Sequence, residues 1–305
     1  MKVTWLGQAG LLFENESIRI IIDPYLSDAC GKKNPKSYRR VPVDERFLGI
    51  VPDVIVLTHD HLDHTDMETL PYYLGADTHV TVLAAPNAWE RVRTLGGGNN
   101  YVLFDRFTEW TQNGVRFSAV KAEHSDRNAI GVIIDDGEKK YYVTGDTLYN
   151  KAILADLPAD LDTVFLPING VGNNMNALDA SRFADAVGAK NAVPLHFGMF
   201  DEKTADDFCA KGKILPRIYS LIDLKYTIGG RAHEKRFDHR RDCEHGACDR
   251  PTVCQKRLGR RHYEPRGEKR RGGCGGFVCR VWRSRTRIYA GACGREGNTG
   301  GVCAV

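Results

Sequence analysis

The chain has 305 residues, enough for two domains and a large core, with 43 basic and 39 acidic side chains and a net charge of +4. Residues 226–305 carry 19 basic and 8 acidic side chains (+11), which leaves 24 basic and 31 acidic side chains (−7) in residues 1–225. The overall positive charge therefore belongs to residues 226–305 and is no sign of nucleic-acid binding by the whole protein. The body's two cysteines and lack of a membrane-spanning or leader-like segment predict a reduced, cytoplasmic protein.

The first part of the body predicts strands joined by turns, because short apolar runs alternate with Gly, Pro and Asn. We expect strands at residues 2–6, 11–13, 18–22, 54–57 and 80–83, and helices at residues 66–74 and 87–95. The polar, broken stretch 27–48 predicts a long loop, which is either a lid or substrate contact or a plain connection.

The second part continues the strand pattern and adds one clear helix. Strands are expected at residues 115–120, 130–134, 141–144, 162–167 and 192–195. Asn176 can cap a helix over 177–187, in which Ala180, Phe183, Ala184 and Val187 share one face. Many strands with a few helices between them predict two packed sheets covered by helices, an α/β sandwich.

A cluster of histidines and aspartates follows the apolar run 54–57. Residues 59–64 read His-Asp-His-Leu-Asp-His. Side chains two apart on an extended segment point the same way, so His59 and His61 can hold one ion, and Asp63 and His64 can reach a second. Imidazole and carboxylate ligands suit zinc, manganese or iron(II). The alternative is a histidine-rich surface loop without an ion.

Other polar residues stand at the carboxyl ends of predicted strands, where loops can line a site. Asp23 follows residues 18–22, His124 follows 115–120, Asp146 follows 141–144, and His196 follows 192–195.

In this order the five motifs resemble those of the metallo-β-lactamase superfamily. The resemblance covers residues 1–225 and implies an αββα sandwich of two mixed β-sheets flanked by helices. It implies that two divalent ions bind, with Asp146 between them and Asp23 orienting their ligands. The implied ligands are His59, His61 and His124 for one ion, and Asp63, His64 and His196 for the other.

Within the superfamily, residues 5–10, 22–27, 58–61, 145–147 and 166–197 look most like the L-ascorbate-6-phosphate lactonase branch. That likeness implies a lactone or ester of a small, phosphorylated sugar derivative as substrate. One departure is Gln8, where these proteins often carry histidine after the glycine, and it affects a local substrate contact rather than the metal ligands.

Two ions that share Asp146 would lower the pKa of a shared water to about 7, giving hydroxide at neutral pH. Asp63 could take a proton from this water as a general base. Near the site, Arg127 could bind a phosphate or carboxylate, or else pair with Asp126. The polar residues Asn128, Asn169 and Asn173 could meet substrate hydroxyls, or serve only in turns and caps.

The sequence disfavours two other functions of the superfamily. A flavodiiron redox protein would have Glu in place of His61, and a nuclease would need a basic groove that a body of charge −7 does not offer. A phosphodiesterase or nuclease of the same superfamily and a non-catalytic metal-binding protein stay as alternatives. We expect a small-molecule substrate, with no membrane or nucleic-acid partner, and leave a homo-oligomer open.

Residues 226–305 differ from the body in kind, being rich in Arg, Gly, Cys and His without apolar periodicity. The spacings Cys243-x4-Cys248-x5-Cys254 and Cys274-x4-Cys279 lack the paired C-x2-C of a zinc ribbon. A nucleic-acid-binding arm would carry more Lys and aromatic residues. We interpret this tail as disordered, or as the product of translation out of frame or past the natural stop.

Overall fold

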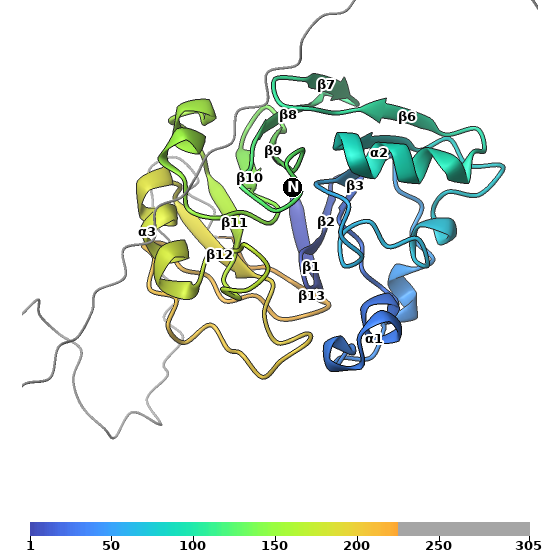
Figure 1. Cartoon of the computed structure of the whole chain (residues 1–305). Helices are drawn as coiled ribbons and strands as arrows, with labels where there is room; N and C mark the ends of the chain where they lie inside the picture. Colours follow the sequence, from blue (N-terminus) through green and yellow to red (C-terminus); the bar gives the residue numbers. More distant parts are fainter. Residues whose placement is uncertain (225–305) are drawn as a thin grey trace, which may run out of the picture. The chain divides into compact units, whose positions relative to one another are not determined.

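The computed structural model describes residues 1–224, in which the strands form two mixed β-sheets (Figure 1). The first sheet has the order β13-β1-β2-β3-β4-β5-β6. Its strands are β1 (Lys2–Gly7), β2 (Gly10–Glu14), β3 (Arg19–Ile22), β4 (Val54–Leu57), β5 (Thr81–Ala84), β6 (Asn100–Leu103) and β13 (Ser220–Leu221).

The second sheet has the order β12-β11-β10-β9-β8-β7. Its strands are β7 (Glu109–Gln112), β8 (Val115–Lys121), β9 (Ile130–Asp135), β10 (Lys140–Val143), β11 (Thr163–Pro167) and β12 (Asn191–Leu195). Every residue of β4, β5, β11 and β12 is buried, as expected of parallel strands that are covered on both faces.

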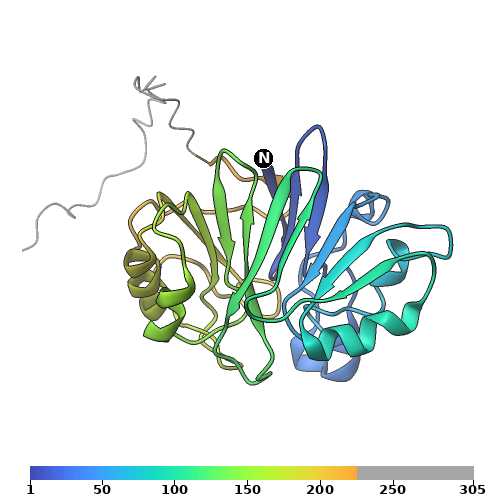
Figure 2. The ribbon, with the colours of Figure 1, turned by 90° about the horizontal axis from the view of Figure 1, so that it is seen from above.

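The two sheets pack face to face, and helices cover their outer faces (Figure 2). The shared core includes Trp5 and Phe13 from the first sheet and Phe117 and Phe165 from the second. Helix α2 (Pro86–Val92) lies over β5 and β6, while α3 (Ala177–Val187) lies over β11. Each helix closes an apolar core of its own. The predicted αββα sandwich is therefore confirmed.

Strand direction explains where a site can form. In the first sheet, β1 is antiparallel to β2, β2 is antiparallel to β3, and β3 is parallel to β4, so β1, β3 and β4 end at the same edge. In the second, β8, β10 and β12 also run the same way. The carboxyl ends of these strands carry the histidines and aspartates that the sequence singled out.

Three expectations about local structure change. The helix expected over 66–74 is wrong, since only the 3-10 turn η3 (Leu70–Tyr72) forms there, and Pro71 cannot donate the hydrogen bond that an α-helix needs. The stretch 27–48 contains α1 (Ala29–Lys33), η1 (Pro35–Ser37) and η2 (Glu45–Phe47). The helix expected over 87–95 ends in η4 (Arg93–Leu95).

In residues 1–224 no helix combines the length and apolar character needed to cross a membrane. The interpretation of residues 226–305 lies outside the described residues.

Candidate metal centre

The loop after β4 folds back tightly on itself. Thr65 Oγ1 donates to the carbonyl of His59 at 2.8 Å, and the N–H groups of His64 and Thr65 donate to the carbonyl of His61 at 3.0 and 2.8 Å. His59 and His64 are fully buried, whereas His61 is partly exposed. This turn lets residues from one short segment face two neighbouring positions.

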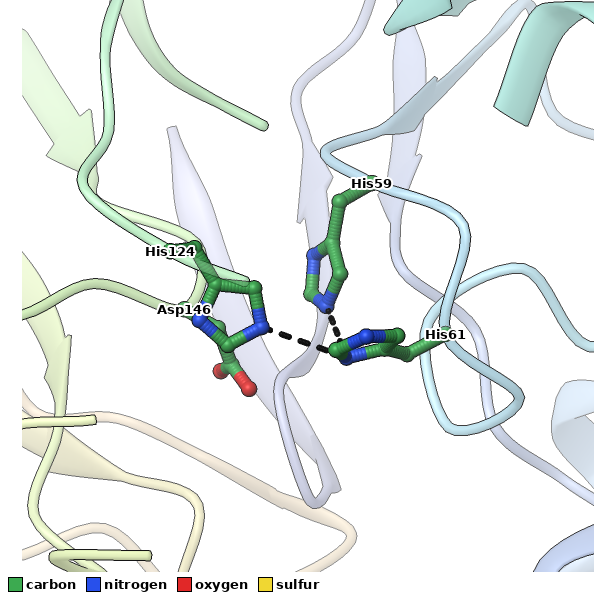
Figure 3. A group of neighbouring side chains, drawn as sticks. All are labelled: His59, His61, His124 and Asp146. Carbon is green, nitrogen blue, oxygen red and sulfur yellow. Dashed lines mark hydrogen bonds between the residues drawn. The ribbon is translucent and has the colours of Figure 1, made fainter. Parts of the chain in front are cut away.

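Three ring nitrogens converge at the first position (Figure 3). His61 Nδ1 lies 3.0 Å from His59 Nε2 and 3.2 Å from His124 Nε2. Two nitrogens that bind one zinc tetrahedrally at 2.0–2.1 Å lie about 3.3 Å apart, so the spacing fits a shared ion. Asp146 completes this set, in which all ligand atoms lie within 4.8 Å of one another.

The outer nitrogens of two of these rings have partners that fix the tautomer. His59 Nδ1 lies 3.1 Å from Thr58 Oγ1, and His124 Nδ1 lies 3.2 Å from the carbonyl of Asn173. A proton on each Nδ1 leaves the lone pair of each Nε2 directed at the first position. Burial also lowers the pKa of His59 and of His124, which keeps both rings in the neutral form that binds metals.

Asp63, His64 and His196 form a second set beside the first. His196 Nε2 lies 3.3 Å from Asp63 Oδ2 and 3.2 Å from Asp146 Oδ2, and His64 Nε2 lies 3.4 Å from Asp146 Oδ1. Within residues 1–224, His64 Nε2 and Asp146 Oδ1 are buried without a hydrogen-bond partner. Two unpaired ligand atoms at one place, one nitrogen and one carboxylate oxygen, fit a divalent ion. Asp146 stands between the two sets.

Asp23 connects the two sets through hydrogen bonds to residues that belong to them or adjoin them. Its fully buried carboxylate accepts hydrogen bonds from His64 Nδ1 at 2.7 Å, from Thr58 Oγ1 at 2.6 Å and from the Thr58 N–H at 2.8 Å. Since Thr58 Oγ1 also contacts His59, one short chain of hydrogen bonds runs from a ligand of the first set to a ligand of the second. Such contacts orient ligands and sharpen metal affinity.

Backbone strain concentrates at this site. Four of the seven non-glycine residues with positive φ in residues 1–224 contact the cluster or belong to it, namely Gln8, Asp23, Asn173 and His196. Left-handed backbone at such residues costs about 1–3 kcal/mol each and is typical of functional sites. Gly145 (φ +59) is needed for a different reason, because a Cβ there would lie 2.8 Å from the carbonyl of Ile130.

Opposite charges balance one another in the metal-free site. Burial opposes the charged form of His196, but Asp146 and Asp63 outweigh it and raise the pKa of His196 to about 9. Burial likewise opposes protonation of His64, and Asp146, Asp23 and Asp63 together raise its pKa well above the usual value. Burial would raise the pKa of Asp63 and Asp146, yet the neighbouring histidines lower both. The aspartates beside them therefore favour the charged forms of His64 and His196, just as they would favour a bound cation.

The metal-free protein should lose stability as the pH rises from about 6.5 to about 9. A group whose pKa is raised by folding contributes stability that is present below its unfolded pKa and is lost as the pH passes its folded pKa, and His196 and His64 are such groups. Urea unfolding with a chelator, between about pH 6 and about pH 10, measures this. An unfolding free energy that stays flat or rises over that range would contradict the charge balance.

Of the residues expected to contact substrate, some lie on the surface and others contact the candidate histidine ligands. The Arg127 side chain is exposed, and Asn128 Nδ2 donates to Asn87 Oδ1 at 3.1 Å. Asn169 Nδ2 lies 2.9 Å from His196 Nδ1, and Asn173 supports His124 through its carbonyl. Asn169 and Asn173 therefore contact two of the candidate histidine ligands directly, and their contact with a substrate stays a prediction.

The sequence did not predict that two residues, Thr58 and Asp126, hold the loops together. Thr58 joins Asp23 to His59, as described above. Asp126 accepts hydrogen bonds from the Asp60 N–H at 3.1 Å and from Asn87 Nδ2 at 2.7 Å, which ties the loop of His124 to the loop of His59. The only signal in the sequence was the position of each residue next to a candidate ligand.

Comparison with known proteins agrees with this geometry. Residues 18–197 match a protein family that is described as the beta-lactamase superfamily domain. The chain is 30% identical over 226 residues to the UPF0173 metal-dependent hydrolase of Carboxydothermus hydrogenoformans, covering 70% of this chain and 93% of that protein. The chain belongs to the metallo-β-lactamase superfamily, in the UPF0173 metal-dependent hydrolase family. It is accordingly a metal-dependent hydrolase.

Other similar proteins support the same assignment to the metallo-β-lactamase superfamily. The UPF0173 protein of Pyrococcus furiosus is 29% identical over 233 residues, covering 74% of this chain and 97% of that protein. The crystal structure of an isothiocyanate hydrolase from Delia radicum gut bacteria superposes with a TM-score of 0.58 at 21% identity, covering 72% of this chain and 98% of that one. At this level of identity the structural likeness shows that the two chains share a fold.

Proposed function

We propose that this metal-dependent hydrolase holds two divalent ions, zinc or manganese, and opens a lactone or similar ester of a small anionic sugar derivative. The resemblance of residues 5–10, 22–27 and 166–197 to the L-ascorbate-6-phosphate lactonase branch supports the substrate class. The arrangement of the two ligand sets around Asp146 supports the use of two ions.

The exposed side chain of Arg127 supports the proposal that the substrate carries an anionic group. It lies three residues past the ligand candidate His124, is exposed, and forms no ion pair in residues 1–224. Its neighbour Asp126 has its carboxylate occupied by Asn87 and the Asp60 N–H, so the pairing of Arg127 with Asp126 is not formed. An unpaired guanidinium beside the ligands is suited to a phosphate or carboxylate.

The chain's own residues supply positioning and a proton acceptor. When bound, divalent ions polarise the ester carbonyl and make water acidic enough to ionise near neutral pH. The carboxylate of Asp63 would hydrogen-bond the attacking water and accept its proton as a general base. Arg127 holds the anionic group of the substrate, which fixes the carbonyl relative to Asp63.

Replacing Arg127 with alanine should raise KM for a phosphorylated sugar lactone by roughly tenfold or more, since a hydrogen bond to a charged group contributes about 1.5–3 kcal/mol. The effect on the unphosphorylated lactone should be small. Steady-state kinetics on both compounds measure this. Arg182→Ala is the matched control, because Arg182 is an exposed arginine of α3 whose ion pair within residues 1–224 is with Asp179.

Equal losses on both lactones would show that Arg127 acts on structure and not on the anionic group. A wider panel of lactones, phosphodiesters and thioesters tests the reaction class itself. Turnover of phosphodiesters alone would overturn the lactonase proposal in favour of a phosphodiesterase of the same superfamily.

A further inference from the structure

Gln8 reaches the metal centre from an element that contributes none of the candidate ligands. It follows β1 at the sheet edge where β3 and β4 also end, so the turn between β1 and β2 places it beside the cluster. Its side chain is 1% exposed, and its backbone has the left-handed φ of +50°. A buried amide on strained backbone is expected where that amide has a specific partner.

In residues 1–224 the side-chain hydrogen-bonding contacts of Gln8 go to the second ligand set. Gln8 Nε2 donates to Asp63 Oδ2 at 2.8 Å, and because an ionised carboxylate only accepts hydrogen bonds, the amide nitrogen must face it. The same nitrogen lies 3.2 Å from both ring nitrogens of His196. An atom equally close to both lies against the face of the ring, so this contact is one of packing.

The backbone of Gln8 also contacts His196. Its carbonyl accepts the N–H of His196 at 3.0 Å and the indole N–H of Trp5 at 2.9 Å. The ring of Trp5 is buried in the core between the sheets, which anchors the turn. Gln8 thus fixes the backbone of His196 and the carboxylate of Asp63 together.

We propose that Gln8 is the positioning residue of the second metal position and determines whether this chain holds one ion or two. In residues 1–224 none of its hydrogen bonds goes to His59, His61 or His124. Removing the amide therefore weakens the second position and leaves the first intact. This inference rests on the two-ion arrangement of the proposed function, and it does not depend on the substrate.

The test replaces Gln8 with methionine in the full-length protein, since methionine keeps the length of the side chain and cannot donate a hydrogen bond. Metal-free protein is titrated with Mn²⁺, and the bound metal is counted after dialysis. Loss of a residue that orients a ligand typically lowers metal affinity about 10–100-fold. We expect one tight equivalent, a second weakened by that factor, and the EPR signal of an isolated Mn²⁺ in place of that of a coupled pair.

Two further variants make the result specific. Gln8→Asn keeps an amide and tolerates positive φ, but is one methylene too short to reach Asp63, so it should show the same loss even if Gln8→Met does not fold. Gln112→Met, the same change at a strand residue whose amide contacts Asp53, should leave both equivalents in place.

Equal weakening of both ions, or two ions bound as tightly as in the unmodified protein, would overturn the role of Gln8. The unmodified protein separates this result from a failure of the proposed function. If it binds two ions and opens no lactone, the substrate is wrong while the inference on Gln8 stands. If it binds a single ion, the two-ion arrangement fails and the inference on Gln8 fails with it.

Discussion

Replacing His61 with alanine should lower kcat/KM by roughly 10³-fold or more while the protein stays folded. His61 Nδ1 lies 3.0 Å from His59 Nε2 and 3.2 Å from His124 Nε2, so its loss opens the first position. A bound ion supplies several kcal/mol of transition-state stabilisation, which corresponds to that factor in rate. The ring of His61 is partly exposed and belongs to none of the apolar cores, so the core keeps its packing.

Steady-state kinetics together with metal analysis measure this effect, and urea unfolding checks the fold. His79→Ala is the matched control, since His79 is exposed and its ring contacts the carbonyl of Gly98. The control should keep full activity and full metal content. A His61 variant that retains its metal and loses less than about tenfold in rate would remove His61 from the ligand set.

Replacing Asp23 with alanine should destabilise the metal-free protein by about 3–5 kcal/mol, the usual cost of removing one partner of a buried charged pair. Three donors, His64 Nδ1 and both donors of Thr58, would be left buried without their acceptor. The φ of +43° adds strain for alanine, whereas asparagine tolerates it. Asp23→Asn should therefore cost less stability than Asp23→Ala but still weaken metal binding through His64.

Urea unfolding of the metal-free variants gives these values. Asp53→Ala provides a reference, because Asp53 also accepts a backbone N–H, that of Arg19, but is only partly buried. Its loss should cost about 1 kcal/mol. If Asp23→Ala cost no more than Asp53→Ala, the chain of hydrogen bonds through Asp23 would not hold the two ligand sets.

Local signals in the sequence predicted much of the fold. The helix over 177–187 has the bounds of α3, since Asn176 accepts a hydrogen bond from the Asp179 N–H as an N-cap should and Gly188 ends it in the left-handed conformation. Three strands were not predicted. β6 and β7 are mostly exposed or partly buried, and β13 has only two residues that pair with β1 from the other end of the described chain.

The ligand candidates were predictable for a reason that does not extend to their supports. Histidine and aspartate at strand ends form a recognisable pattern, and parallel strand ends must meet at one edge of a sheet. Gln8 and Thr58 carry no such pattern, because an amide or a hydroxyl acquires its role only from a partner. For Gln8 that partner, Asp63, lies 55 positions away in the sequence.

The most direct test of the two-position centre is anomalous X-ray diffraction from crystals of the full-length protein grown with Mn²⁺ or Zn²⁺, combined with metal analysis of the purified protein. We expect two ions, with Asp146 between them. One should lie among His59, His61 and His124, and the other among Asp63, His64 and His196. Less than one equivalent of zinc, manganese or iron in the purified protein, or a metal peak away from these residues, would contradict the account.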